Sequence, residues 1–539
     1  MITERTIINA LLIGASLIMA PFIISESLSY DYVPAEILGG LFALVIAFFV
    51  LKDALCICPL LGLNIAGGLN FLPLGLDAAT VACILLIIYY TIVYILVRQK
   101  RFKLGKPGFF WPMLIVTLIV LYHNHSLSIR ILGGSEEGGK PALYIYLFVL
   151  AYFCGINIPS PSVSFLSKVP LYIIILTGIS NIPFLLTSFV PSLAPYLYRV
   201  TDNVNVGVYI DSLAGSSGVT DGAVSRLGAL GQFGGVLQIY LLANYPIGTW
   251  LRPERWWIAI LSFFCVMCAV YSGYRNVVFS FALASLIAVS CYYSWRALIL
   301  PIALFIGMLV LLVASSNGVI PLPVNKIPII AQRTLSFLPF DWDPEAIASS
   351  ASSNEFRYNI QKVYRDEYML RSPLLGNGFT INTKEFNALS DSLKYGGAGS
   401  DPEYTQAKAF IEGKLFHTGW ISVYDAVGII GTMAFIALGV SEVLVAAKFI
   451  FKPKADRRSP LFPLYIWIFV NVTTMMISFF AVFGDFGQIF RDLCVYGIVL
   501  SHLSSITSRS GTPSVLPMRK GQMEFSRLGG AQYGYQSKS

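Results

Sequence analysis

Long apolar runs alternate with short polar segments along nearly the whole chain. A run of about 20 apolar residues can cross a lipid bilayer as a helix. Backbone groups in lipid must be paired within their own segment, so these runs are predicted to be helices. The predicted crossings are 7–24, 36–51, 77–97, 108–122, 141–157, 168–190, 229–246, 256–272, 277–294, 297–315, 418–447, 461–483 and 492–507.

A weaker apolar segment, 55–75, is interrupted by prolines and glycines, including Pro59, Gly67 and Pro73. It is either a further crossing or a re-entrant piece, because broken backbone is tolerated at membrane depth where protein surrounds it. If it crosses, the chain has about 14 transmembrane helices, and both termini lie in the cytoplasm.

Basic residues support this topology. Cytoplasmic loops carry an excess of Lys and Arg, and the 14-crossing count puts every basic segment on that side. These residues are Arg98, Lys100, Arg101, Lys103 and Lys106, then Arg252 and Arg255, then Lys448, Lys452, Lys454, Arg457 and Arg458, and finally Arg509, Arg519, Lys520 and Arg527. The segments 123–140, 191–228 and 316–416 then face outward.

Composition excludes a soluble protein. Of the 539 residues, 56% are hydrophobic and only 12% are charged, whereas an average soluble domain has about 25% charged residues. The net charge of +8 is explained by the cytoplasmic loops, and no basic domain points to nucleic acid. We therefore predict an all-α polytopic membrane protein.

The predicted organisation is a membrane domain, 1–507, that contains one large extracytoplasmic loop, 316–416. Loops of that length in compact membrane proteins are usually functional. The segment 508–539 is rich in Ser, Gly, Arg and Gln and is predicted to be a disordered cytoplasmic tail.

The middle of the large loop predicts a short amphipathic helix that lies on the membrane surface. Its apolar positions are Phe356, Ile360, Val363 and Leu370, and its other face carries Arg357, Gln361, Tyr364 and Tyr368. Pro373 ends the helix, and glycines follow in a turn. An arginine on such a helix either extends to lipid headgroups or binds a phosphate bidentately.

Two further residues are candidates for chemistry. Arg275 lies in a very short connection between two apolar helices, where a charge is expensive unless it is paired or used. His417 begins a helix at the same predicted outer face and is a candidate general base. Each also has a plain interfacial interpretation. His123 and His125 form a possible metal pair, but no acidic cluster joins them.

In this order and spacing, the residues resemble the O-antigen ligase and O-antigen polymerase superfamily of bacterial envelope glycosyltransferases. The resemblance rests on Ser-Gly-Tyr-Arg275, then Phe-Arg357 leading to Ser-Pro-Leu-Leu-Gly-Asn-Gly378, then His417 before Gly-Ile-Ile-Gly-Thr. It covers roughly residues 200–445. The family often has Asn after this histidine, where the chain has Thr418.

The resemblance implies an inverting, metal-independent GT-C-like glycosyltransferase with no cofactor. Its donor would be a glycan on undecaprenyl pyrophosphate, and its acceptor a glycan or lipid. The active site would face the periplasm or exterior of the bacterial inner membrane. His417, Arg275 and Arg357 are the implied catalytic residues. Arg226, Arg365 and Tyr364 are the candidate substrate-binding residues.

Two other functions stay open at this stage. A transporter or flippase of lipid-linked glycans would usually bury charges in the middle of its helices, and such charges are scarce along these apolar runs. A structural scaffold would not need arginines clustered in a large outer loop. The motifs do not separate polymerase from ligase, although the chain length and the additional Arg226 favour polymerase slightly.

Overall fold

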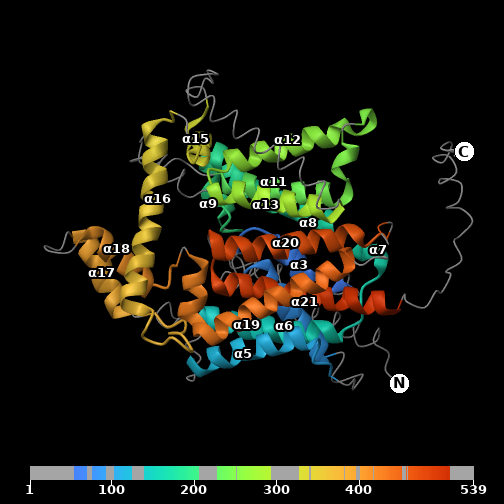
Figure 1. The fold of residues 1–539 in the computed structure, drawn as a ribbon, viewed down its shortest axis with the longest axis horizontal. Coiled ribbons are helices and arrows are strands. Elements are labelled where there is room, and N and C mark those ends of the chain that lie inside the picture. The colour runs from blue at the N-terminus through green and yellow to red at the C-terminus, as the bar shows by residue number, and fades with distance from the viewer. Residues whose placement is uncertain are drawn as a thin grey trace, which may run out of the picture.

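The computed structural model describes most of the chain and shows a bundle of helices with a helical layer across one end (Figure 1). Every regular element in the described residues is a helix, apart from one isolated bridge between Gly68 and Asp77. The described residues are 54–68, 76–92, 102–123, 139–198, 200–204, 227–250, 252–292, 327–338, 341–381, 383–395, 401–416, 418–451, 457, 459–482 and 484–509.

Six helices in this part of the chain are long and apolar enough to cross a membrane. They are α8 Val169–Phe189, α12 Trp256–Tyr271 with the turn before it, α13 Arg275–Tyr292, α19 Gly419–Ile450, α20 Phe462–Ala481 and α21 Phe486–Arg509. The other long helices are α4 Ala78–Tyr89, α5 Pro107–His123, α6 Gly139–Asn157 and α11 Gly228–Asn244. The prediction of an all-α membrane protein is confirmed. The count of 14 is not, and the predicted crossings 7–24, 36–51 and 297–315 lie outside the described residues.

Helices α19, α20 and α21 form the centre of the bundle. Helix α21 packs against α6 and α19, α19 packs against α5 and α20, and α20 continues to α11 and α13. Large apolar side chains also cover the outside of the bundle, such as Trp111, Ile179 and Phe263. An apolar exterior of this kind is what lipid, and not water, stabilises. Short turns of helix connect the long ones: α7 Val163–Leu166, η5 Pro191–Leu193, α9 Ala194–Leu197, η7 Ile247–Thr249 and η8 Pro253–Arg255.

The segment 55–75 is not a continuous helix where it is described. Its only helix, α3, is Cys58–Gly62, and five residues rise only about 7.5 Å. Ile57 and Leu60 are fully buried. In the loop that follows, the Ala66 N–H donates to the Ser180 hydroxyl on α8 at 3.0 Å. This part of the segment is therefore a short buried insertion. Residues 69–75 are outside the described residues.

The described residues of three basic segments lie at one end of the bundle. Lys106 Nζ donates to Ser504 Oγ near the end of α21, at 2.5 Å, and Arg457 donates to the carbonyl of Tyr292 at the end of α13. The hydroxyl of Tyr292 donates to the Ala243 carbonyl, near the start of the connection that carries the other basic pair. This grouping agrees with the predicted loops, but which side of the membrane it faces stays a prediction.

The opposite end carries the large loop, whose helices are α15 Ile329–Leu335, α16 Pro344–Val363, the π-helical turn η11 Tyr364–Tyr368, α17 Thr383–Tyr395 and α18 Pro402–Glu412. In Figure 1, α16 runs across the ends of the bundle helices, nearly at right angles to them. Asp343 caps α16 by accepting from the Glu345 N–H, and Pro344 occupies its first turn, as helix starts favour.

The predicted face of the loop helix needs a correction. Ile360 and Val363 are buried as expected, but Tyr364 and Tyr368 are buried beside them and Leu370 is 83% exposed. The π-helical turn adds a residue to the helical repeat, so it rotates the following side chains relative to a regular α-helix. Tyr364 lies four residues after Ile360 and shares its face in a regular α-helix, and beyond the turn Tyr368 is buried while Leu370 is exposed.

Candidate active site

The Ser272–Arg275 turn places Arg275 at the first position of α13. Gly273 has a positive φ of 78°, a conformation that glycine adopts without strain. The buried Ser272 hydroxyl closes the turn by donating to the Ala269 carbonyl and accepting from the Tyr274 N–H. The Ser-Gly-Tyr-Arg sequence is thus a compact helix connection that aims one arginine out of the bundle.

Arg275 reaches helix α16 of the large loop. Its guanidinium donates to the Ser350 carbonyl at 3.3 Å and to Asn354 Oδ1 at 3.0 Å. Arg357 lies three residues after Asn354, which puts it one turn further along the same side of α16. The two predicted arginines, 82 positions apart in the sequence numbering, are therefore brought to one region at the end of the bundle that carries the large loop. Both are half-buried.

Tyr364 and Arg365, the other loop candidates, are placed differently. Arg365 is exposed. Tyr364 is fully buried, and its hydroxyl donates to Asp425 Oδ1 at 3.3 Å. Burial raises the pKa of Tyr364, and the Asp425 carboxylate raises it further, so the phenol stays neutral. A contact of Tyr364 with substrate stays a prediction. Its hydrogen bond to Asp425 links the loop to α19, a structural role that the sequence did not indicate.

A buried network around Asp425 joins the loop to α19. Asp425 is only 1% exposed. Besides Tyr364, it accepts from Lys414 Nζ at 2.5 Å and from Asn377 Nδ2 at 2.8 Å. Lys414 has a φ of 57°, an uncommon conformation for a residue with a side chain. An acidic residue within the apolar run 418–447 was the available signal, because such residues are rarely incidental.

The segment Ser-Pro-Leu-Leu-Gly-Asn-Gly is inserted into a break in α19. At Gly428 the helix has φ 64° and ψ −167°. Across the break, the Ile429 N–H donates to the Pro373 carbonyl, the Ile430 N–H to the Leu374 carbonyl, and the Asn377 N–H to the Asp425 carbonyl. The loop backbone therefore replaces the hydrogen bonds that the helix loses, as buried backbone groups require.

Two glycines permit this insertion. A Cβ on Gly376 would lie 2.5 Å from the Gly428 nitrogen, and Gly376 itself has a φ of 78°. A Cβ on Gly428 would collide with the backbone of Leu374. Only glycine fits such a close backbone approach combined with positive φ. The glycines of this motif are thus explained by packing between the loop and α19.

His417 and Arg226 lie outside the described residues, but their chain neighbours are placed. The ring of Phe416 meets the ring of Tyr364 edge-on at 5.9 Å, and Thr418 precedes the first residue of α19. Leu227 donates its N–H to the Ser272 carbonyl, in the turn that carries Arg275. The chain neighbours of His417 and of Arg226 therefore lie at the end of the bundle that carries Arg275.

The possible metal pair is placed only in part. His123, at the end of α5, has its Nε2 2.9 Å from the carbonyl of Leu375, so it helps to hold the inserted segment. His125 is outside the described residues. Among the described residues, no three His, Cys, Asp or Glu side chains are grouped as metal ligands.

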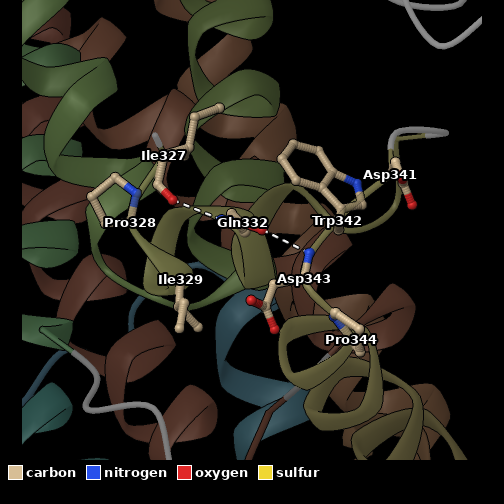
Figure 2. Close-up of a pocket in the computed structure, with 8 residues that line it drawn as sticks. All are labelled: Ile327, Pro328, Ile329, Gln332, Asp341, Trp342, Asp343 and Pro344. Atoms are coloured by element: carbon tan, nitrogen blue, oxygen red, sulfur yellow. Dashed lines mark hydrogen bonds between the residues drawn. The ribbon is translucent and has the colours of Figure 1, made fainter. Parts of the chain in front are cut away.

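A cavity of about 680 Å³ lies at the start of α16. Figure 2 shows Gln332 at its centre, bridging the Ile327 carbonyl and the Asp343 N–H. Its lining residues are Ile327, Pro328, Ile329, Gln332, Asp341, Trp342, Asp343 and Pro344. None of the predicted site residues lines this cavity, so it is separate from the region around Arg275.

No family model matches the chain, and no curated protein sequence matches it.

Proposed function

We propose that the protein is an envelope glycosyltransferase. It would polymerise or ligate glycans from an undecaprenyl-pyrophosphate-linked donor at the outer face of the bacterial inner membrane, with polymerisation slightly favoured. The observation that carries the proposal is the contact of Arg275 with α16, one helical turn before Arg357. It supports a shared arginine site formed by the loop and the bundle.

The proposed chemistry is a single inverting displacement. The acceptor hydroxyl attacks the anomeric carbon of the donor, the bond from that carbon to the pyrophosphate oxygen breaks, and His417 takes the hydroxyl proton. Arg275 and Arg357 bind the pyrophosphate and stabilise the negative charge that develops on it. This stabilisation is stronger near lipid than in water, because the effective dielectric constant is lower.

The acceptors that the structure shows for Arg275 suit this role. The Ser350 carbonyl and the Asn354 amide oxygen are neutral acceptors that orient the guanidinium against α16. A planar guanidinium has five N–H donors in a fixed geometry.

The test is transfer activity in Arg275→Ala, Arg357→Ala and His417→Ala. Removing one group that stabilises transition-state charge costs about 10²–10³ in rate, and removing a general base costs about 10²–10⁴. Product chain length in cells and polymer formed from purified donor are measured at equal protein levels. Lys362→Ala, an exposed change on the same helix, is the matched control. Normal product from Arg275→Ala and His417→Ala would refute the catalytic assignment.

A transporter or flippase of lipid-linked glycans is the second candidate. The structure favours it at one point, because charged side chains of the bundle are partly or fully buried. Arg491 contacts Asp77 at 2.5 Å and Asp492 at 3.1 Å, and Glu442 is fully buried in α19. Proteoliposomes separate the two functions. A flippase moves labelled lipid-linked glycan across the bilayer without lengthening it, whereas the proposed enzyme lengthens or transfers it.

A further inference from the structure

Glu442 is the most deeply buried acid in the described residues whose carboxyl oxygens accept no hydrogen bond there. It is 0% exposed, and neither Oε1 nor Oε2 has a partner in the described part of the chain. It lies eight residues before Ile450, the last residue of α19, which is about 12 Å from that end of the helix. An ionised carboxylate without partners at such a position is very costly.

One neighbour of Glu442 is Tyr152 on α6. A Cβ built on Gly497 would lie 3.2 Å from Glu442 Oε1 and 3.2 Å from Cε2 of Tyr152. The carboxyl group and the tyrosine ring therefore lie side by side against the same glycine of α21. The hydroxyl of Tyr152 also lacks a hydrogen-bond partner in the described residues.

Tyr152 extends from Glu442 towards the end of the bundle that carries the lysines. Its hydroxyl lies close to Gly105, and its polar neighbours are the Ser501 side chain and the backbone of Lys106. These groups do not meet hydrogen-bond geometry with the hydroxyl. Polar atoms slightly beyond direct contact are the usual setting for a bridging water molecule.

The titratable groups around Glu442 come from several helices. Cys494 and Tyr496 of α21 and Tyr152 of α6 face it. On α5 and the residue before it, the titratable groups are Lys106 at the start, which donates to Ser504, and His123 and Tyr122 at the far end. On α20, the phenol of Tyr465 bonds to Thr507. In the described residues, none of the cations among these groups forms an ion pair with Glu442.

We propose that Glu442 is a proton-binding site inside the membrane domain, held as the neutral acid and connected through Tyr152 and bridging water to the end of the bundle that carries Lys106. The carboxylic acid donates to water that occupies the space near Tyr152, and its proton exchanges with solvent along that route. This inference does not depend on the proposed glycosyltransferase activity, because Glu442 lies far from the outer end of α19.

Infrared spectroscopy of the full-length protein in lipid tests the protonation state. The carbonyl stretch of a protonated carboxylic acid is separate from the amide and carboxylate bands. The wild type minus Glu442→Gln spectrum at neutral pH should contain this carbonyl band, and Glu442→Asp should shift it. Glu412→Gln is the matched control, because that buried acid accepts from Tyr368 at 2.6 Å, and its variant should retain the Glu442 band. A difference spectrum that contains only carboxylate bands would overturn the proposal.

Transfer into D₂O tests the route. The band of Glu442 should shift when its proton exchanges, and Tyr152→Phe should slow that shift by about tenfold or more, as expected for the loss of a positioned proton carrier. A band that never shifts in D₂O would overturn the connection to solvent, and so would an unchanged exchange rate in Tyr152→Phe. The wild-type measurement needs no variant, so the test remains decisive even if Tyr152→Phe does not fold.

Discussion

Asp425 and Glu442 lie on the same helix, on opposite sides of the break at Gly428, and both are almost completely buried. Asp425 accepts from Lys414, Asn377 and Tyr364, whereas Glu442 has no partner in the described residues. The difference shows two uses of a buried acid. One holds two parts of the fold together, and the other accepts no hydrogen bond among the described residues.

The largest effect that this comparison predicts is for Asp425→Ala. Removing one member of a buried ion pair leaves the other charge uncompensated, which costs about 3–5 kcal/mol. Lys414 would be left without its carboxylate, and Asn377 would lose an acceptor. Thermal unfolding in detergent, followed at several concentrations of protein, measures the change. A melting temperature equal to that of the wild type would show that the network does not hold the loop.

The break in α19 comes next. Gly428→Ala introduces a Cβ that collides with the Leu374 backbone at a positive φ, and backbone strain alone costs about 1–3 kcal/mol. Proteolysis of the large loop under native conditions should become faster, because the inserted segment is displaced. Gly235→Ala is the matched control, since a Cβ there meets nothing within 4 Å, and alanine is the better helix former. Equal effects at the two sites would contradict the inserted-loop explanation.

The smallest effect is expected for Glu442→Met, and its sign is opposite. Replacing a buried acid that lacks partners with an apolar side chain of similar length removes a desolvation cost of about 1 kcal/mol. The variant should therefore unfold at the same temperature as the wild type or slightly higher. A strong loss of stability would show that Glu442 has a structural partner, as Asp425 does.

The long apolar elements were predictable from the sequence. The runs 141–157 and 168–190 became α6 and α8 with ends within two residues, because lipid leaves an apolar segment few alternatives to a helix. The amphipathic helix of the loop was also found, although it is longer than expected and its register changes at the π-helical turn.

The features that depend on distant contacts were not predictable. Gly428 lies within an apolar run that predicts one continuous helix, and its break is closed by residues 373–377, which supply the missing hydrogen bonds. The partners of Asp425 come from three different parts of the chain, so no local pattern shows them. For the candidate site, the order Arg275, Arg357, His417 was read from the sequence. The contact between Arg275 and α16 required the fold, and the positions of Arg226 and His417 stay predictions.

The insertion at Gly428 has a consequence for chimaeric proteins. Each hydrogen bond across the break joins one loop residue to one α19 residue. Neither segment can therefore satisfy its own backbone groups without the other. An exchange that replaces residues 316–416 but keeps the native α19 would place a foreign segment against the break at Gly428. Residues 373–377 and 419–430 therefore have to be transplanted together if the backbone hydrogen bonds across the break are to be kept.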